Sequence, residues 1–331
     1  MKVTFFSTKA YDKEFMNKSN AAYHFELFFF ETALNPETAK LAEGSDAICI
    51  FVNDNVSKQT INALSKLHIK LIALRCAGFN NVDLKAAKEA GIKIVRVPAY
   101  SPYAVAEHTL AMILTLNRKT HTAYNRIRNG NFSLERLMGF DLRNKTVGVI
   151  GTGTIGKIFA EIAKGVGCKV IAYDLYPDTD LKNEGIQYVT LAELYKTADI
   201  ISLHCPLTAH TKYIINEKTI ALMKNKVMLI NTSRGSLVNT QAVINGLKNE
   251  KIGYFGMDVY EQEENLFFED LSGSIIKDDM ISRLMTFPNV LITAHQAFFT
   301  EEAITNIADT TLKNLSDFKN QQLLENEVLL N

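Results

Sequence analysis

The sequence is poor in glycine and proline, carries no excess of either charge and has no long apolar run. It holds 17 glycines and 6 prolines among 331 residues, which excludes collagen-like and low-complexity disordered chains. Basic and acidic residues number 36 each, so the formal net charge is zero. This balance argues against a dedicated nucleic-acid binder, so we expect no nucleic-acid partner. No apolar stretch reaches the ~18 residues of a membrane span, so we expect no membrane partner.

Cysteine is scarce as well. Cys49, Cys76, Cys168 and Cys205 form no Cys-x-x-Cys pair, so neither a zinc site nor a thioredoxin-like motif is indicated, and we expect no metal. The apolar surroundings of the cysteines favour buried free thiols in a reducing compartment. The apolar run before Ser7 is too short for the core of a signal peptide. These features together predict a cytoplasmic protein.

Short, almost continuously apolar runs alternate with longer amphipathic stretches along the chain. Continuous apolarity favours strands buried on both faces, as in a parallel sheet covered by helices. The repeated strand–helix order predicts a doubly wound α/β architecture, and the length predicts about two domains. The predicted strands are Val3–Ser7, Ala47–Val52, Leu71–Arg75, Ile92–Val95, Val147–Ile150, Val170–Tyr173, Ile200–His204, Val227–Asn231 and Val290–Thr293. The predicted helices between them are Asn55–Leu67, Asp83–Ala90, Ile155–Val166, Leu191–Ala198, Glu217–Met223 and Thr240–Asn249.

Two further helical stretches indicate how the domains are joined. A long helix is predicted over Ser101–Asn129, where Pro102 suits the first turn. It is too long for an ordinary crossover, so we expect it to join or separate domains. A helix over Glu301–Phe318 follows the last strand, and its place near the chain end suggests that it returns to pack on the first domain.

A glycine motif follows the strand at Val147–Ile150. Gly151, Gly153 and Gly156 fit the pattern G-x-G-x-x-G, and a second strand ends in Asp174, 18 residues after the third glycine. The pattern is weak alone, but strand, glycines, helix and acid in this order form a dinucleotide-binding fingerprint. The first glycine allows a tight turn, the second admits a pyrophosphate, and the third permits close helix–strand packing. The helix N-terminus offers free N–H groups to the phosphates.

Asp174 selects between the two nicotinamide dinucleotides. A carboxylate at this place accepts hydrogen bonds from the adenosine ribose and repels a 2′-phosphate, and no arginine follows it, so we expect NAD(H) as the cofactor. A glycine-rich turn with an incidental aspartate is the alternative. The loop residues expected to contact the cofactor are Gly151, Thr152, Gly153, Thr154, Ile155 and Gly156.

Three polar residues stand at or after the ends of later strands. They are Arg234, Glu263 and His295, and ligands of open α/β sheets bind at the carboxyl ends of strands. Arginine would hold a carboxylate by a two-pronged contact. Histidine would exchange the hydroxyl proton, and the acid would fix the imidazole tautomer. The set suits a dehydrogenase of keto or hydroxy acids, although each residue considered alone is more often an ordinary surface residue.

The chain resembles the D-2-hydroxyacid dehydrogenase family, and within it is most similar to the fermentative D-lactate dehydrogenases. The resemblance spans almost the whole chain in one order. The segments that carry it are Arg75-Cys-Ala-Gly-Phe-Asn-Asn-Val-Asp83, Val97-Pro-Ala-Tyr-Ser-Pro102, Ala106-Glu-His-Thr109, Gly151–Gly156, His204-Cys-Pro-Leu-Thr208, Asn231-Thr-Ser-Arg-Gly235, Met257-Asp-Val-Tyr-Glu-Gln-Glu263, Leu266-Phe-Phe-Glu-Asp270 and His295-Gln-Ala-Phe-Phe-Thr300.

The resemblance implies catalytic roles for the three polar residues. Arg234 is expected to anchor the substrate carboxylate, His295 to act as acid and base, and Glu263 to be its partner. Two more glutamates, Glu261 and Glu264, lie beside Glu263; the family spacing selects Glu263.

The same resemblance implies further binding residues. Backbone N–H groups of Ala77 and Gly78, together with Tyr100, are expected to bind the substrate. Asp258 is expected near the nicotinamide. We also expect the cofactor to contact His204, Pro206, Thr232 and Ser233, although a structural role for His204 is an equal alternative.

The family fold implies a discontinuous, flavodoxin-like substrate domain with an inserted NAD-binding Rossmann domain. We expect the substrate domain at 1–100 and 299–331, and the NAD-binding domain at 101–298. Family members are homodimers, sometimes tetramers, so a homodimer is expected.

Phe298 and Phe299 after the catalytic histidine bear on the substrate. Bulky rings there would shrink the pocket and favour a methyl group, so we expect pyruvate and D-lactate; both rings could instead only pack the hinge. Ala294 stands where formate dehydrogenases of the family carry glutamine, so formate is disfavoured. The alternatives are larger 2-keto acids (2-ketoisocaproate, phenylpyruvate, hydroxypyruvate) and an NAD(H)-sensing corepressor-like protein.

Overall fold

The computed structural model describes residues 1–263 and 266–329. The chain divides into two compact units. One consists of Met1–Ser101 together with Phe299–Asn331, and the other of Pro102–Phe298. The chain passes from the first unit to the second at 101/102, one residue after the predicted boundary at 100/101. It returns at 298/299, where the second boundary was predicted.

The discontinuous unit is built on a parallel sheet. Its described residues form five strands in the order β2-β1-β3-β4-β5, which is the flavodoxin-like order. Every residue of β3 and β4 is buried, because helices cover both faces, as the apolar runs predicted. Its elements are β1 (Lys2–Phe5), α1 (Ala10–Asn20), β2 (Glu26–Phe29), η1 (Ala39–Ala42), β3 (Ala47–Ile50), α2 (Lys58–Lys66), β4 (Leu71–Leu74), α3 (Leu84–Glu89), β5 (Lys93–Arg96) and α12 (Glu301–Lys319).

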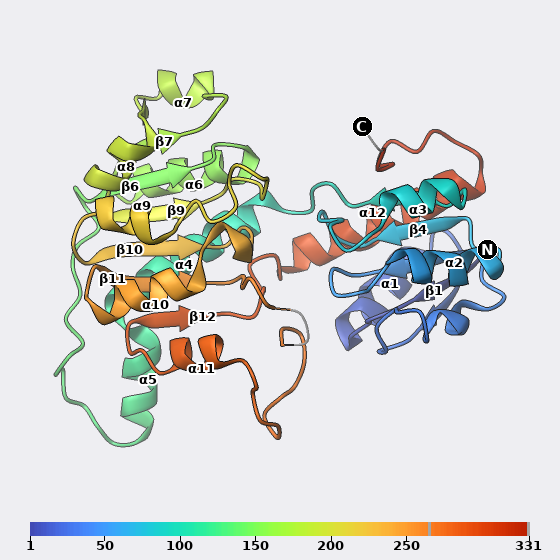
Figure 1. Ribbon diagram of the computed structural model, residues 1–331, viewed down its shortest axis with the longest axis horizontal. Helices are drawn as coiled ribbons and strands as arrows, with labels where there is room; N and C mark the ends of the chain where they lie inside the picture. Colours follow the sequence, from blue (N-terminus) through green and yellow to red (C-terminus); the bar gives the residue numbers. More distant parts are fainter. Residues whose placement is uncertain (264–265, 330–331) are drawn as a thin grey trace. The chain divides into compact units, whose positions relative to one another are not determined.

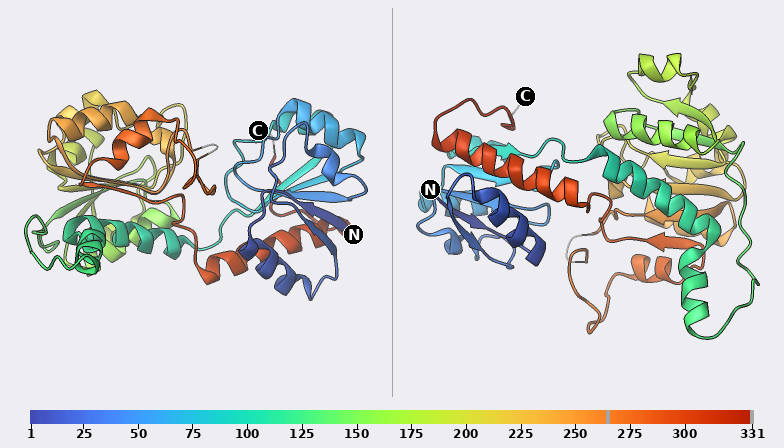
Figure 2. Two further views of the ribbon diagram at one scale, coloured as in Figure 1. Left: turned by 90° about the horizontal axis from the view of Figure 1, so that it is seen from below. Right: turned by 180° about the vertical axis from the view of Figure 1, so that it is seen from behind.

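The C-terminal helix α12 returns to this unit, as predicted. It lies beside α1 (Figure 2), where Oγ of Ser19 donates to Oδ1 of Asp309 over 2.6 Å. Its buried Asn314 donates to the carbonyl of Arg96 at the end of β5. The helix thereby closes one face of the sheet, and the two ends of the chain belong to one folding unit.

The inserted unit is a larger parallel sheet. Among residues 102–263 and 266–298, seven strands run in the order β12-β11-β10-β9-β6-β7-β8 (Figure 1). The strand order reverses between β6 and β9, and ligands of open α/β sheets bind at such a switch point. Two parallel α/β units of this kind confirm the predicted fold class. The elements are α4 (Pro102–Arg118), α5 (Thr120–Arg128), β6 (Thr146–Ile150), α6 (Thr154–Gly165), β7 (Lys169–Tyr173), α7 (Thr179–Asn183), β8 (Gln187–Tyr188), α8 (Leu191–Thr197), β9 (Ile200–Leu203), α9 (Glu217–Leu222), β10 (Val227–Asn231), η2 (Gly235–Leu237), α10 (Thr240–Lys248), β11 (Ile252–Met257), α11 (Asp279–Met285) and β12 (Val290–Ile292).

In the inserted unit, one predicted helix is divided and one inner strand was not predicted. The helix expected over Ser101–Asn129 is two helices, α4 and α5, because Lys119 between them adopts a left-handed backbone with φ of 52°. Strand β11 was missed because Gly253 and Gly256 interrupt its apolar pattern. A Cβ on Gly253 would lie 2.6 Å from the carbonyl oxygen of Lys226, so close strand packing requires the glycine.

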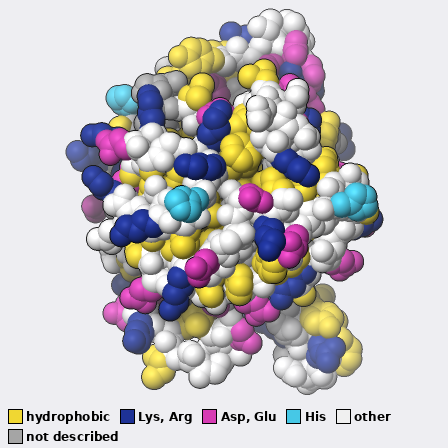
Figure 3. Space-filling model, turned by 90° about the vertical axis from the view of Figure 1, so that its right-hand side faces the viewer, with side chains coloured by type: hydrophobic (Ala, Val, Ile, Leu, Met, Phe, Trp, Pro, Cys, Tyr) yellow, Lys and Arg dark blue, Asp and Glu magenta, His cyan; other side chains and the backbone are white. Residues whose placement is uncertain are grey.

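The remaining sequence-level expectations concern cysteines, charge and membrane helices. All four cysteines are buried free thiols, as predicted. Basic and acidic side chains are interspersed on the face drawn in Figure 3. Within the described residues, no helix is both long and apolar enough to cross a bilayer. The same residues hold no group of three or more histidine, cysteine, aspartate or glutamate side chains placed to bind a metal ion.

Candidate active site

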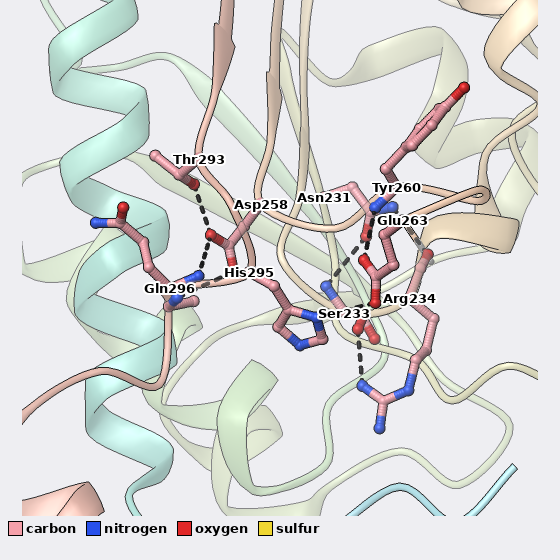
Figure 4. Close-up of polar contacts among 10 residues, drawn as sticks. Asn231, Ser233, Arg234, Asp258, Tyr260, Glu263, Thr293, His295 and Gln296 are labelled. Atoms are coloured by element: carbon pink, nitrogen blue, oxygen red, sulfur yellow. Dashed lines mark hydrogen bonds and ion pairs between the residues drawn. The ribbon is translucent and has the colours of Figure 1, made fainter. Parts of the chain in front are cut away.

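The three candidate catalytic residues follow adjacent strands. Arg234 comes after β10, Glu263 after β11 and His295 after β12, and these strands are neighbours in the sheet. Because parallel strands present their carboxyl ends at one edge, the loops that carry the three side chains meet there (Figure 4). The sheet order therefore assembles residues that are up to 61 positions apart in the sequence.

His295 and Glu263 form a direct pair. Nδ1 of His295 lies 3.0 Å from Oε1 of Glu263 (Figure 4). Since a carboxylate only accepts hydrogen bonds, this contact places a proton on Nδ1 and leaves Nε2 to exchange one. The other oxygen, Oε2, accepts from the backbone N–H of Tyr260 over 3.0 Å. The side chains are 20% and 22% exposed, so the pair is sheltered yet reachable.

The structure distinguishes the neighbouring glutamates. Oε2 of Glu261 accepts from the hydroxyl of Tyr213 over 2.8 Å, and Oε1 accepts from the N–H of Thr240. Both oxygens of Glu261 are therefore engaged away from the imidazole. Glu264 lies outside the described residues. Of the two glutamates described, Glu263 is the one that contacts the histidine.

Asp258 organises the loop that carries His295. Its side chain is fully buried, and its oxygens accept from the N–H groups of Gln296 (2.8 Å) and Ala297 (3.0 Å) and from the hydroxyl of Thr293 (2.6 Å). Its own carbonyl accepts from the N–H of His295 over 2.7 Å. These bonds hold His295 in a left-handed conformation with φ of 52°, which costs of order 1–3 kcal/mol and persists only where the surroundings impose it. Contact between Asp258 and the nicotinamide stays a prediction.

Hydrogen bonds and a close contact between the backbones of two loops fix the position of Arg234. Asn231 donates to the carbonyl of Arg234 over 2.9 Å, and Nη1 of Arg234 donates to the carbonyl of Ser233 over 2.7 Å. A Cβ on the following Gly235 would lie 2.0 Å from the carbonyl carbon of Tyr260, so only glycine allows the two loops to touch. The half-buried guanidinium keeps further N–H donors for an anion.

The glycine loop after β6 has the form that a dinucleotide requires. Gly151 has a φ of 93°, and a Cβ on Gly156 would lie 1.9 Å from the carbonyl oxygen of Gly151, so both positions demand glycine. By contrast, a Cβ on Gly153 would meet no atom within 4 Å, which leaves room for a pyrophosphate. Gly153 caps α6 without a side-chain bond, so the N–H groups of the first turn, including those of Thr154 and Ile155, are suited to an anion. The loop fits NAD.

Asp174 stands at the end of β7 beside this loop. Its Oδ2 accepts from the N–H of Thr152 over 2.6 Å and from the Thr152 hydroxyl over 3.2 Å, and Oδ1 accepts from the N–H of Tyr176. The Tyr188 hydroxyl completes the network on Thr152. The carboxylate is thereby fixed next to the glycine loop, at the place where the fingerprint puts the ribose.

His204 lies on the other side of the glycine loop. Its Nε2 is 2.8 Å from Oγ of buried Ser202, its ring lies 5.0 Å from that of Phe159, and its Cβ is a neighbour of Gly156. Burial lowers the pKa of His204 to about 3, so the imidazole is neutral at pH 7. These contacts give His204 a structural role at the switch point; a contact with the cofactor stays a prediction.

Other candidate cofactor residues join neighbouring loops. Oγ of Ser233 donates to the carbonyl of Cys205, next to exposed Pro206. Oγ1 of Thr232 lies 2.9 Å from that of Thr109 on α4. The loop after β10 is thus tied both to the loop after β9 and to α4.

The candidate substrate residues Ala77, Gly78 and Tyr100 belong to the discontinuous unit. The carbonyl of Ala77 accepts from Nη1 of Arg96, and that of Gly78 from Sγ of Cys76. The carbonyl of Tyr100 accepts from Asn306 on α12. Their contact with substrate stays a prediction.

The two candidate pocket phenylalanines belong to different units. Phe298 is buried, and its ring lies 6.4 Å from the imidazole of His295 in an edge-on contact. Phe299 is half exposed, and its ring lies 4.7 Å from that of Tyr11 in the discontinuous unit. Sequence reasoning missed Phe268, whose ring lies 5.8 Å from that of His295. Phe268 lies in the segment Leu266–Asp270, which matches the family. That match could have pointed to Phe268, but no single residue of the segment was assigned a role.

Known proteins resemble this chain in both sequence and structure. The model of the family "D-isomer specific 2-hydroxyacid dehydrogenase, NAD binding domain" matches residues 110–297. D-lactate dehydrogenase of Escherichia coli is 53% identical over 329 residues, covering 99% of this chain and all of that protein. The apo-structure of D-lactate dehydrogenase from Escherichia coli aligns with a TM-score of 0.92 at 50% identity, over 99% of this chain and 100% of that one. The pyruvate reductase of Chlamydomonas reinhardtii aligns with a TM-score of 0.94 at 45% identity, over 98% of each chain.

The chain therefore belongs to the D-isomer specific 2-hydroxyacid dehydrogenases, an NAD-dependent oxidoreductase family, and its inserted unit contains the NAD-binding domain.

Proposed function

We propose that this member of the family reduces pyruvate to D-lactate, reversibly, by the reaction pyruvate + NADH + H⁺ ⇌ D-lactate + NAD⁺. The observation that carries the proposal is the His295–Glu263 pair, 3.0 Å apart, in loops adjacent to that of Arg234 at the carboxyl edge of an NAD-binding sheet. An acid–base group beside a carboxylate anchor is what stereospecific reduction of a 2-keto acid needs.

Each side chain of the set has one task. Arg234 holds the substrate carboxylate by two parallel hydrogen bonds and stabilises negative charge that develops on the carbonyl oxygen. His295 donates the proton at Nε2 to that oxygen, and Glu263 holds the ring and stabilises its charged form. Backbone N–H groups of Ala77 and Gly78, together with Tyr100, are also proposed to bind the substrate. Thr232, Ser233 and Pro206 are proposed to contact the cofactor, and Asp258 to lie near the nicotinamide. NADH, when bound by the glycine loop and Asp174, supplies the hydride.

Aromatic rings near the imidazole support a small substrate. The rings of Phe268 and Phe298 lie 5.8 Å and 6.4 Å from that of His295, and bulky rings beside the acid–base group would favour a substrate with a small side chain. Phe299 is also proposed to contact the substrate. Larger 2-keto acids such as 2-ketoisocaproate, phenylpyruvate and hydroxypyruvate are the alternative substrates.

The test follows NADH absorbance at 340 nm with a series of 2-keto acids of increasing side-chain size. We expect the highest kcat/KM for pyruvate and D-lactate as the only enantiomer formed. His295→Ala should lose at least a hundredfold in kcat, as for removal of a general acid, while NADH still binds. No turnover with any 2-keto acid would instead favour an NAD(H)-sensing, corepressor-like protein, and near-normal turnover by His295→Ala would contradict the assigned role.

We also propose that the chain forms a homodimer through its inserted unit. The segment that contains α5 and the residues after it exposes several apolar side chains, a pattern that favours association. They are Tyr124, Ile127, Phe132, Leu134 and Met138, 54–87% exposed. Light scattering should give twice the mass of the chain, and Phe132→Asp with Leu134→Asp should lower it; a tetramer or a monomer would contradict the proposed state.

A further inference from the structure

We infer that His108 on α4 is a positioning residue for His295, acting through Thr293 and Asp258. The inference rests on the proposed acid–base role of His295. His108 touches neither Arg234 nor Glu263 in any described contact, so it would act only through the loop that carries the catalytic ring.

The contacts form a short relay. Nε2 of His108 lies 3.2 Å from Oγ1 of Thr293, and that hydroxyl donates to Oδ1 of Asp258 over 2.6 Å. Because the hydroxyl hydrogen is used on the carboxylate, its oxygen accepts from His108, which places the imidazole proton on Nε2. The same nitrogen lies 3.6 Å from Oδ1 of Asp258. The imidazole therefore fixes the hydroxyl in the one orientation that serves the carboxylate.

The carboxylate in turn fixes the catalytic loop. Oδ1 and Oδ2 of Asp258 accept from the N–H groups of Gln296 and Ala297. Its carbonyl accepts from the N–H of His295, which sits in a left-handed conformation that the surroundings must impose. If the relay is broken, the carboxylate can turn, these bonds lengthen, and His295 loses its angle to Glu263 and to the substrate.

Burial and charge suit this role. The side chain of Asp258 is fully buried and that of His108 is 17% exposed. Burial lowers the pKa of His108, so a neutral N–H donor is present at neutral pH. A buried carboxylate needs each of its donors, because an unsatisfied buried charge is costly.

The relay connects two segments of the inserted unit that lie next to the crossings between the units. Helix α4 begins at Pro102, directly after one crossing between the units, and the loop held by Asp258 ends at Phe298, directly before the other. The relay therefore joins the two segments of the inserted unit that lead into the crossings, and it sets the position of the acid–base residue between them.

The test compares three variants with a matched control. His108→Leu removes the donor, His108→Gln keeps an N–H at the end of a flexible chain, and Thr293→Val removes the hydroxyl at nearly constant volume. We expect kcat for pyruvate to fall about tenfold in His108→Leu and in Thr293→Val, since small misplacements of catalytic groups cost up to about 100-fold. The Kd for NADH should stay within about twofold, and His108→Gln should recover most of kcat. The control His210→Leu replaces an exposed histidine and should match the wild type.

Two further readouts separate positioning from simple packing. The double variant His108→Leu/Thr293→Val should lose no more kcat than either single variant, because both cut one relay. Amide hydrogen exchange of the peptide over residues 293–298 should quicken in His108→Leu. Unchanged kcat with a lower Tm, additive losses, or faster exchange confined to α4 would each overturn the inference. Because exchange needs no turnover, it stays informative if the wild-type chain reduces no 2-keto acid, which would refute the proposed function instead.

Discussion

The environment of His204 leads to a quantitative prediction for stability at low pH. The imidazole contacts Ser202 and the ring of Phe159 beside the glycine loop, and its burial lowers the pKa to about 3. An unfolded histidine titrates near about 6.5. Above that pH the ring is neutral in both states and has no linkage to folding. Below that pH, His204 of the unfolded chain binds a proton, whereas His204 of the folded chain stays neutral. The free energy of unfolding therefore decreases as the pH falls from about 6.5 towards about 3.

The size of the effect follows from the gap between the two pKa values. The free energy of unfolding falls by about 1.4 kcal/mol for each pH unit below the unfolded value, and by pH 5 the loss from His204 alone is about 2 kcal/mol. Other groups also titrate in this range, so the contribution is isolated by comparison with His204→Gln. Glutamine keeps an N–H for Ser202 and cannot take up the proton.

Urea unfolding followed by far-UV circular dichroism suits this chain, which has no tryptophan. Between pH 7.5 and pH 5, the wild type should lose about 2 kcal/mol more than His204→Gln. The exposed His210→Gln variant is the control and should follow the wild-type curve. Parallel losses in wild type and His204→Gln would refute the reasoning, since they would mean that the folded chain accepts the proton at His204.

Three further predictions concern binding and the other unit. Arg234→Lys should raise the KM for pyruvate about tenfold, because the planar fork is lost; an unchanged KM in steady-state assays would contradict the anchor role. Asp174→Ala should raise the ratio of NADPH to NADH affinity about tenfold, since the carboxylate that repels the 2′-phosphate is gone; paired titrations with both dinucleotides check this, and an unaltered ratio would count against it. Arg75 is 1% exposed and donates to Asp12 and to the carbonyls of Phe6 and Ser7. Arg75→Met should lower the free energy of unfolding by about 3–5 kcal/mol in urea titrations, because a buried carboxylate loses its partner; a loss below about 1 kcal/mol would show that Asp12 does not depend on Arg75.

Much of the fold was readable from local pattern. Continuous apolar runs identified strands such as Val227–Asn231, where prediction and structure coincide, because strands covered on both faces admit few polar residues. Strand β2 (Glu26–Phe29) was not predicted, since it lies at the sheet edge and alternates exposed with half-buried residues. Strand β11 was not predicted because its glycines interrupt the apolar pattern. Close packing against the neighbouring strand requires these glycines, although glycine has a low strand propensity.

The sequence by itself determined the fold class, the dinucleotide fingerprint and the identity of Arg234, Glu263 and His295 as candidates, because each depends on residue type and local spacing. Only the tertiary structure showed how the two described glutamates are engaged: Glu261 is held by Tyr213 and Thr240, and Glu263 contacts His295. It also showed that Asp258 holds the catalytic loop from a fully buried position. The physical reason is that hydrogen bonds between loops depend on strand order and backbone direction, and residues far apart in sequence acquire these only when the sheet assembles.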